Sequence, residues 1–562
     1  MKPLTIVMKN LFLLFSAIVI TIAAASQTKS VKIPPNKDTV LVTSVTTTTV
    51  IPAQVTTTNT ITTTIIPTNP GPGPGPGPGG EIALSFTPET GYLELPFARV
   101  EQWFDQNYAA IPATNPAQRL DIYWRFLWTQ LEGQTSGSYS WVKFDQVINA
   151  AIAKRQRVGI GIFLLCPGGC DPFNGPVYYD GFSSGYPLYL HQLMQGEAVK
   201  DRVLGTDAGN RTWVPNWNSQ NLKTRYQALL FALRDHINTT TVNGVKYSDV
   251  VNYVDIRLYG SWGEWHNGGI VNNMSDYPAG MRPTIETYKW FFDVHILAFP
   301  NNPLAMLLAA LDAERLNHTL TPVEITNYAL TVRNGWGPLG IRADQQGSLQ
   351  WNDPGNYVNQ YMQNNNKSWQ GGPLFSTYTM NRWKTSPLLG EPENNGDNPN
   401  LQTLVAQAQL YKRNSVGNGN FTRSAGADQN MRNAAAAMGY KLQLTGGKIN
   451  YSGSAVVVSL NWINTGQTPV YEKNWVTTID IVNSLGAVVQ TKTSAFNPFL
   501  FLPAANPVTI TDNLPGLPVG SYTAILTVRD PTNYRAPLPL YIKGRNPAGS
   551  YTLGSFTISA NN

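Results

Sequence analysis

Short apolar runs alternate with amphipathic segments between residues 81 and 440. The run "VGIGIFLL" (158–165) is continuously apolar, which is typical of a parallel strand covered on both faces. The segment before it, "FDQVINAAIAKRQ" (144–156), places Phe144 and Val147 at helical spacing, which favours an amphipathic helix. This alternation of strands and helices predicts an α/β architecture.

The number of such units favours a barrel. One further, poorly marked strand is expected between "VGIGIFLL" and "NLKTRY". The count fits an eightfold (β/α)8 TIM barrel over residues 81–440. The alternative is a doubly wound open sheet, which would usually show an early Gly-rich phosphate turn, and none appears. The other predicted strands are "RLDIYWRFLW", "VGIGIFLL", "VNYVDIRLYG", "LAMLLAA", "LGIRADQQG" and "SPLLGEPE".

From about residue 441 the hydrophobic spacing changes to every second residue. Segments such as "GSAVVVSLNWINTG" and "GSYTAILTVRD" alternate apolar and polar positions and are separated by Gly, Pro and Asn turns. Short strands of this kind predict an all-β, immunoglobulin-like sandwich of seven or eight strands over residues 441–562.

The N-terminal 80 residues have a different composition. Lys2 and Lys9 precede "LFLLFSAIVITIAAA", which is typical of a secretory signal peptide over residues 1–25. A retained signal anchor is the alternative. Residues 26–80 are rich in Thr, Pro and Gly, including "GPGPGPGPGG", and predict a disordered or semi-rigid linker. We therefore expect a secreted or cell-surface protein with no membrane insertion after signal cleavage.

Charge and cysteine content exclude some functions. Charged residues make up only 13% of the chain, and the net charge of +6 comes from scattered bases, so a nucleic-acid partner is not expected. The two cysteines, Cys166 and Cys170 in "CPGGCDP", are expected to form a disulfide in an oxidising compartment. They provide half of a zinc site at most, and we expect neither a metal nor a cofactor.

Glutamates stand where a barrel would have its mouth. Catalytic groups of TIM barrels come from the C-terminal ends of the strands. Glu264, in "YGSWGEWH" (259–266), and Glu391, in "LLGEPE", each follow a predicted strand. A pair of carboxylates can cleave a glycosidic bond, one donating a proton and the other attacking or activating water. Glu393 competes with Glu391 for the second place.

The residues beside Glu264 in the sequence allow a prediction of the pKa of its carboxyl group. Trp262, Trp265 and His266 flank it, and we expect the aromatic surroundings to raise the pKa of this carboxylate. The chain has 15 Trp and 26 Tyr, and aromatic rings stack well on the C–H faces of sugars. For Trp128 and its neighbours, packing in the core is an equal alternative.

Several of these motifs resemble known glycosidases. The stretch "YWRFLWTQLEGQTSGSYSWVKFDQVINAAIAKRQRVGIGI" resembles the first two barrel strands of clan A glycoside hydrolases, and is closest to the family 42 β-galactosidase type. With "VDIRLYGSWGEWH", "LGIRADQQG" and "LLGEPE", residues 85–560 resemble the bacterial family catalogued as domain of unknown function 4832. The positions that carry the family 42 resemblance are Trp128, Leu131, Glu132, Gly133, Tyr139, Trp141 and Asp145.

This resemblance implies roles for particular residues. Glu264 would be the acid/base at the end of strand four and Glu391 the nucleophile at the end of strand seven. The reaction would be retaining, with the carboxyl groups about 5 to 5.5 Å apart. One position departs from the clan: Gly263 stands where an Asn usually contacts the 2-hydroxyl of the sugar. The candidate substrate-binding residues are Trp128, Glu132, Trp262, His266, Asp344 and Glu393.

Two functions remain open from the sequence. The first is a secreted glycoside hydrolase that acts on a polysaccharide or glycoconjugate through two carboxylates. The second is a non-catalytic surface protein that binds carbohydrate in the same cleft, a function that Gly263 favours. The sequence does not define the sugar, the linkage or the oligomeric state.

Overall fold

The protein is described here from a computed structural model, which divides into two compact units, Met1–Gly77 and Pro78–Asn562. The backbone is described for residues 22–23, 27–30, 39–51, 54–66, 79–89, 100–103, 121–168, 177–307, 322–346, 368–392, 401–417 and 436–559. Side chains are described for residues 79–89, 121–168, 177–307, 322–343, 368–390, 405–415 and 436–559.

The first unit contains four strands within its described residues. β3 (Thr39–Ile51) and β4 (Gln54–Ile66) pair antiparallel along all 13 residues of each strand. β1 (Ile22–Ala23) and β2 (Gln27–Ser30) also pair with β3. The Thr, Val and Ile residues of these strands have branched side chains that favour extended backbone. The linker over residues 26–80 stays a prediction.

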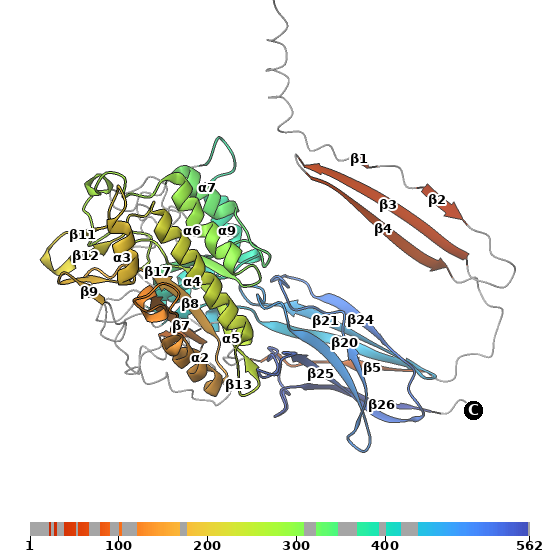
Figure 1. Ribbon diagram of the computed structural model, residues 1–562. Coiled ribbons are helices and arrows are strands. Elements are labelled where there is room, and N and C mark those ends of the chain that lie inside the picture. The colour runs from red at the N-terminus through yellow and green to blue at the C-terminus, as the bar shows by residue number, and fades with distance from the viewer. Residues whose placement is uncertain are drawn as a thin grey trace, which may run out of the picture. The chain divides into compact units, whose positions relative to one another are not determined.

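Eight parallel strands in the second unit follow one another around a TIM-barrel-like sheet (Figure 1). Each of the first seven strands pairs with its neighbour in chain order, from the first to the seventh, and the eighth pairs with the first. Asn414, just before the eighth strand, donates its backbone N–H to the carbonyl of Leu388 in the seventh over 3.2 Å. The strands are β6 (Val100–Trp103), β7 (Asp121–Leu127), β8 (Val158–Phe163), β15 (Val251–Ile256), β16 (Leu304–Leu307), β17 (Gly340–Gln346), β18 (Leu388–Pro392) and β19 (Val416–Gly417).

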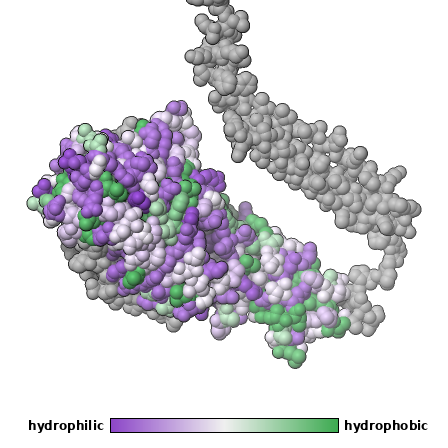
Figure 2. All heavy atoms as spheres, viewed as in Figure 1, coloured by the Kyte–Doolittle hydropathy of each residue, from purple (hydrophilic) through white to green (hydrophobic). Residues whose placement is uncertain are grey.

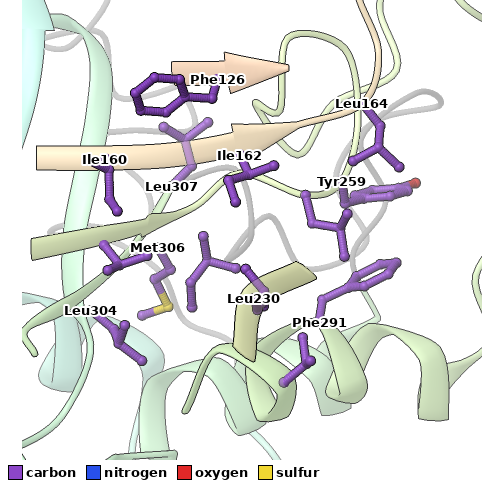
Figure 3. Packing of buried hydrophobic residues seen from close by; sticks show 14 of the residues in the cluster. Phe126, Ile160, Ile162, Leu164, Leu230, Tyr259, Phe291, Leu304, Met306 and Leu307 are labelled. Carbon is purple, nitrogen blue, oxygen red and sulfur yellow. The ribbon is translucent and has the colours of Figure 1, made fainter. Parts of the chain in front are cut away.

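Helices connect these strands and cover the sheet. Every residue of β8 and β15 is buried, as expected for parallel strands packed on both faces. Figure 3 shows Ile160 and Ile162 of β8 in one packed layer with Leu230 and Phe291, which come from two of the helices. The helices are α1 (Trp128–Leu131), α2 (Val142–Lys154), α3 (Leu188–Gln195), α4 (Gln220–Thr239), α5 (Tyr247–Val250), α6 (Ile285–Ala298), α7 (Val323–Thr331), α9 (Phe375–Asn381) and α10 (Leu401–Leu410).

The poorly marked strand expected after "VGIGIFLL" is not part of the barrel sheet. Residues 177–214 contribute a separate small sheet, and the missing barrel strand is β6, which precedes β7. The segments predicted as the first two strands are therefore the second and third. This correction leaves β15 fourth and β18 seventh. The small sheet consists of β9 (Val177–Tyr179), β10 (Phe182–Ser184), β11 (Arg202–Leu204) and β12 (Thr212–Val214), and β13 (Thr241–Val242) pairs with β14 (Val245–Lys246) further on.

The C-terminal region consists of two four-stranded antiparallel sheets, which confirms an all-β region beginning near residue 441. β5 (Gly80–Leu84), expected in the barrel, instead pairs with β20, because antiparallel pairing between distant segments leaves no local sequence signal. The immunoglobulin-like topology stays a prediction. The remaining strands are β20 (Leu442–Ser452), β21 (Ala455–Asn464), β22 (Val476–Asn483), β23 (Val488–Thr493), β24 (Val508–Leu514), β25 (Gly520–Arg529) and β26 (Tyr551–Ile558).

The sandwich packs against the N-terminal ends of the barrel strands. Arg157, just before β8, lies 2.7 Å from the carboxylate of Glu472 and donates to Asn252 at the start of β15. Tyr534 donates its hydroxyl to the carbonyl of Gln156. These described contacts join the sandwich to the barrel at the opposite end from the C-terminal ends of the strands.

The barrel and the sandwich differ on the face shown in Figure 2. Hydrophilic residues cover most of the barrel there, whereas apolar residues gather over the sandwich. No helix within the described residues is long and apolar enough to cross a membrane. The exposed large apolar residues of the sandwich are Leu485, Val488, Val489, Leu502, Val508 and Val519.

Candidate active site

The segment "YGSWGEWH" forms a compact loop after the fourth barrel strand. The backbone N–H of Ser261 donates to the carbonyl of His266 over 2.7 Å, and that of Glu264 donates to Ser261 over 2.8 Å. Trp262 and Trp265 adopt φ angles of 51° and 57°, which are uncommon for residues other than glycine. The loop folds back on itself, so Glu264 stands beside the strand ends although β15 ends at Ile256.

The two tryptophans of the loop have different surroundings. Trp265 is fully buried, donates its indole N–H to the carbonyl of Ile256 over 2.8 Å, and stacks on Phe292 of α6. Trp262 is only half-buried. Trp265 therefore anchors the loop, whereas Trp262 retains an accessible surface. Trp262 packs against the small cluster of Leu127, Phe163 and Cys166.

Gly263 is required by the shape of the loop. Its φ angle is +72°, and a Cβ atom at this position would lie 2.2 Å from the carbonyl oxygen of Arg257 and 2.8 Å from Cβ of Phe163. An Asn at this position would therefore collide with the backbone. The glycine at position 263, where clan A usually has Asn, therefore follows from the backbone conformation of this loop, because no side chain fits there unless the loop moves.

The carboxylate of Glu264 lies among three basic side chains. Nη1 of Arg125, on β7, lies 2.6 Å from Oε1 of Glu264. Nη1 of Arg257 lies 3.7 Å from the same oxygen, and Nε2 of His266 lies 3.3 Å from Oε2. The side chain of Glu264 retains 18% of its exposure and that of Arg125 retains 10%. The group is therefore largely desolvated but reachable from solvent.

This arrangement contradicts the expectation that the pKa of Glu264 is raised. Burial raises the pKa, as predicted, but the charge of Arg125, the hydrogen bond from His266 and the charge of Arg257 together outweigh it. The pKa of Glu264 is held below its ordinary value. The sequence prediction considered the aromatic neighbours and missed the guanidinium groups of Arg125, on β7, and Arg257, directly after β15.

A buried polar cluster inside the barrel positions these groups. Oδ2 of Asp255 accepts hydrogen bonds from Nε of Arg257 over 2.6 Å and from the hydroxyl of Tyr123 over 2.5 Å. The guanidinium of Arg342 lies 3.7 Å from the centre of the Tyr123 ring. Gly161 of β8 makes room, because a Cβ there would lie 2.9 Å from Cγ of Arg257. Asp255 thus fixes Arg257 beside Glu264.

Two of the predicted substrate-binding residues are buried instead. Trp128 is 0% exposed and packs edge-to-face on Tyr226. Its indole N–H donates to Oε2 of Glu132 over 2.6 Å, and Oε1 of Glu132 accepts from the backbone N–H of Gly137 over 2.7 Å. Trp128 is therefore a core residue, and Glu132 accepts the hydrogen bond of its indole N–H. Contact of either side chain with a sugar is not supported.

For most of the remaining predicted site residues, the structure describes the backbone but not the side chain, or neither. Asp344 lies on β17 and Glu391 near the C-terminal end of β18, but neither side chain is among those described, and Glu393 lies outside the described residues. Cys166 is disulfide-bonded. Its expected partner, Cys170, also lies outside the described residues, so the pairing stays a prediction. Trp262 and His266 are beside Glu264, as expected.

Sequence reasoning missed the basic and polar residues of the site. A signal was present in the period-2 pattern of the strands, since Tyr123 and Arg125 lie on one face of β7, and Asp255 and Arg257 continue one face of β15. Charged residues inside otherwise apolar parallel strands are unusual. That anomaly marks Arg125 and Asp255 as residues of a buried polar site.

Comparisons with known proteins add the following. No family model matches the chain, and no curated protein matches it. The resemblance to the domain of unknown function 4832 and to family 42 therefore stays a prediction. Among the described residues, no group of three or more His, Cys, Asp or Glu side chains is arranged to hold a metal ion.

Several solved structures share part of the chain's shape. Endo-glycoceramidase II from Rhodococcus sp., described as a lactosyl-enzyme intermediate, is 12% identical, with 77% of this chain and 100% of that chain covered and a TM-score of 0.36. The catalytic domain of β-amylase from Paenibacillus polymyxa is 10% identical, with 62% and 96% covered and a TM-score of 0.37. A GH5-4 broad specificity endoglucanase from an uncultured bacterium is 12% identical, with 56% and 80% covered and a TM-score of 0.33. At these scores, the likeness to the solved structures adds no argument on function, and the TIM-barrel-like fold rests on the order of the strands.

Proposed function

We propose that this chain is a glycoside hydrolase-like protein that cleaves an O-glycosidic bond with Glu264 and Glu391. The observation that carries the proposal is their place in the barrel: Glu264 follows the fourth of eight parallel strands, and Glu391 lies near the end of the seventh. The C-terminal ends of barrel strands surround the active sites of such enzymes. Two carboxylates at that end are the groups that glycosidic cleavage requires.

The finer assignment follows from the sequence resemblance. Clan A glycosidases carry their two glutamates after strands four and seven, and the corrected strand count supports the same placement here. A retaining reaction would require the two carboxyl groups to lie about 5 to 5.5 Å apart. The domain of unknown function 4832 and the family 42 type remain the proposed relatives.

Carbohydrate is the proposed ligand. Trp262 is half-buried, and the side chain of His266 is 25% exposed beside the Glu264 carboxylate. An accessible indole next to polar groups suits a sugar, whose C–H faces pack on aromatic rings while its hydroxyls form hydrogen bonds. A polysaccharide or glycoconjugate is the substrate class that we propose.

A non-catalytic carbohydrate-binding protein is the second candidate. Two observations favour it: Arg125 occupies one oxygen of Glu264, and Gly263 leaves no room for the Asn that clan A uses at the sugar 2-hydroxyl. Such a protein would bind sugar at the same barrel mouth without turnover.

The experiment that separates the two candidates uses the purified protein with Glu264→Gln and Glu391→Gln variants. Each is assayed on a panel of aryl glycosides and plant or algal polysaccharides, and binding of the same polysaccharides is measured by calorimetry. The matched control is Glu324→Gln on α7, whose carboxylate pairs with Lys289 away from the barrel interior. Turnover by the wild type and the control that both site variants lose supports hydrolysis. Binding without turnover supports the second candidate.

We also propose export. A signal peptide over residues 1–25 and a Thr/Pro/Gly-rich segment over 26–80 would place the barrel outside the cell, secreted or at the surface. N-terminal sequencing of the exported protein tests this: a mature chain that begins at Ser26 supports cleavage, and an intact Met1 in the membrane fraction contradicts it.

A further inference from the structure

We infer that Tyr471, in the sandwich, is a positioning residue for the active site, because it packs in one cluster with the tyrosines of the polar network beside Glu264. This role rests on the proposed function for the identity of the site, but it can be tested without turnover. It makes part of the sandwich necessary for the arrangement of the barrel mouth.

The loop between β21 and β22 lies across the N-terminal end of the barrel. Three consecutive residues of this loop contact the segments that precede β8, β17 and β18, which are the third, sixth and seventh barrel strands. Contacts with strands on different sides of the barrel require the loop to pass under its interior. The three pairs are Glu472 with Arg157 (2.7 Å from Oε1 to Nη1), Lys473 with Trp336 (5.5 Å from Nζ to the ring centre) and Tyr471 with Trp383 (2.5 Å from the donating hydroxyl to the backbone carbonyl).

The ring of Tyr471 lies inside the barrel. It is 1% exposed and packs in one apolar cluster with side chains from the second, fourth, fifth and seventh strands. Side chains from strands that are not neighbours meet across the interior of a barrel, which layers of side chains fill. Tyr471 therefore occupies the N-terminal end of that interior. Its partners from these strands are Tyr123 of β7, Tyr253 of β15, Ala305 of β16 and Leu389 of β18.

Tyr123 and Tyr253 connect this apolar cluster to the polar network. Their rings stack, with centroids 6.2 Å apart and an interplanar angle of 8°. The hydroxyl of Tyr123 donates to Oδ2 of Asp255 over 2.5 Å. The hydroxyl of Tyr253 accepts a hydrogen bond from Nη1 of Arg342 over 3.0 Å. Each tyrosine packs through its ring and bonds through its tip, so a displaced ring moves a hydrogen-bond partner of Asp255 or Arg342.

Asp255 carries the connection on to Glu264. Oδ2 of Asp255 also accepts from Nε of Arg257 over 2.6 Å, and the side chains of both residues are 0% exposed. Nη1 of Arg257 lies 3.7 Å from Oε1 of Glu264. A buried polar network keeps its geometry while its hydrogen-bond partners stay in place. Tyr471 is therefore linked to Glu264 through ring packing, two hydrogen bonds and an ion pair.

Tyr534 is a matched residue elsewhere in the sandwich. It is 4% exposed, and its hydroxyl also meets the barrel, at the carbonyls of Ala151 and Gln156. Its ring packs in the cluster formed between the barrel sheet and its helices, not in the interior cluster of Tyr471. A residue at the N-terminal face of a barrel usually serves stability alone. Comparison of the two tyrosines separates a stabilising role from a positioning one.

The test compares Tyr471→Leu, Tyr471→Phe and Tyr534→Leu in the full chain. Both Leu variants should lower the thermal unfolding midpoint, because each leaves a cavity in a core. The readout of position is the titration of the Glu264 carboxyl group, followed by 13C NMR without a substrate. We expect its midpoint to rise in Tyr471→Leu, because the charge of Arg257 lowers it in the wild type. It should keep the wild-type value in Tyr471→Phe, which retains the ring, and in Tyr534→Leu.

Turnover provides a second readout on any aryl glycoside that the wild type hydrolyses. Tyr471→Leu should lower kcat about tenfold or more and leave KM within about threefold, because a displaced catalytic group loses stabilisation of the transition state. Tyr534→Leu should keep kcat within about twofold of the wild type.

Two results would overturn the positioning role. Equal Glu264 titrations in all four proteins would show that Tyr471 serves stability alone, and equal shifts in Tyr471→Leu and Tyr534→Leu would show a general loosening of the fold. If Tyr471→Leu does not fold, Tyr471→Met takes its place, because Met fills irregular space in a core. A wild type that hydrolyses no glycoside contradicts the proposed function, whereas the titration still decides the role of Tyr471.

Discussion

Nη1 of Arg125 lies 2.6 Å from Oε1 of Glu264, although 139 residues separate them in the chain. Arg125 belongs to the second barrel strand and Glu264 to the loop after the fourth. The barrel brings the two together because the C-terminal ends of parallel strands converge at one mouth. This ion pair decides the ionisation of the only glutamate of the proposed catalytic pair whose side chain is described.

Removing the guanidinium of Arg125 should destabilise the protein. In Arg125→Met, Glu264 remains a largely buried carboxylate without its nearest counter-ion. Breaking such a pair costs about 3–5 kcal/mol. The free energy of unfolding, measured by urea denaturation at pH 7, tests this. The matched control is Lys448→Met, which breaks the exposed pair with Glu81 and should change stability by less than about 0.5 kcal/mol. Equal effects of the two substitutions would contradict the buried pair.

The stability that Glu264 contributes should depend on pH in one direction. Its folded-state pKa is below its ordinary value, so the unfolded chain takes up the proton more readily. The contribution is fully present above the unfolded pKa of about 4.3 and is lost as the pH falls through the lower folded pKa. The difference in unfolding free energy between wild type and Glu264→Gln should therefore be constant from pH 7 to about 5.5 and shrink below about 4. A difference that begins to shrink near pH 6 would indicate a raised pKa.

Gly263→Asn should be poorly tolerated. The substitution gives the residue that clan A usually has, but its Cβ would lie 2.2 Å from the carbonyl oxygen of Arg257. We expect a loss of about 1–3 kcal/mol, as for other overpacked sites. Gly181→Asn is the control, because Gly181 also has a positive φ, +79°, but nothing lies within 4 Å of the added atom. Since Asn tolerates this backbone region, the control should lose far less. Equal unfolding midpoints for the two variants would contradict the steric account.

The sandwich and the barrel should unfold together. Arg157 bridges Glu472 of the sandwich and Asn252 of β15. Arg157→Met should lower the free energy of unfolding by about 3 kcal/mol, because the buried Glu472 keeps the hydrogen bond from Trp475 but loses the guanidinium that pairs with its charge. Intrinsic fluorescence and far-UV circular dichroism should show a single coincident urea transition in the wild type. Two separate transitions would show that the barrel and the sandwich are energetically independent.

The sequence predicted the architecture well where apolar patterns are long. "VGIGIFLL" and "VNYVDIRLYG" are barrel strands because continuous burial requires continuous apolar side chains. β6 was missed because "VEQW" is short and half polar. β5 was assigned to the barrel because its pairing with β20 depends on residues more than 350 positions away, which no local pattern encodes.

The site was predicted less completely than the fold. Glu264, Trp262 and His266 are together because they are close in sequence. Arg125 was missed because the partner of a buried carboxylate on another strand is set by strand register, not by neighbours in the chain. Arg257 was missed because the loop folds back on itself and so returns Glu264 to the end of β15. For Trp128 the sequence left core packing and sugar contact equally open, because whether an indole faces solvent or the core depends on the helix packed against it, here α4 through Tyr226.

His266 should shift the ionisation of Glu264. His266→Leu removes the donor at Nε2 that lies 3.3 Å from the carboxylate. Because this hydrogen bond lowers the pKa of Glu264, that pKa should rise towards its ordinary value when the donor is lost. His266→Gln, which retains an N–H donor, should restore most of the effect. The acidic limb of the pH–activity or pH–binding profile reports the shift, and identical profiles for wild type and His266→Leu would contradict it.

The ionisation of Glu264 can be measured directly, without a substrate. The protein is labelled with 13C at the carboxyl carbon of glutamate, and the Glu264 resonance is assigned by its absence from Glu264→Gln. We expect the midpoint of its titration to lie below the ordinary value of about 4.3. A midpoint at or above the ordinary value would show that burial outweighs the basic neighbours of Glu264, and would contradict the claim that the ion pair with Arg125 decides its ionisation.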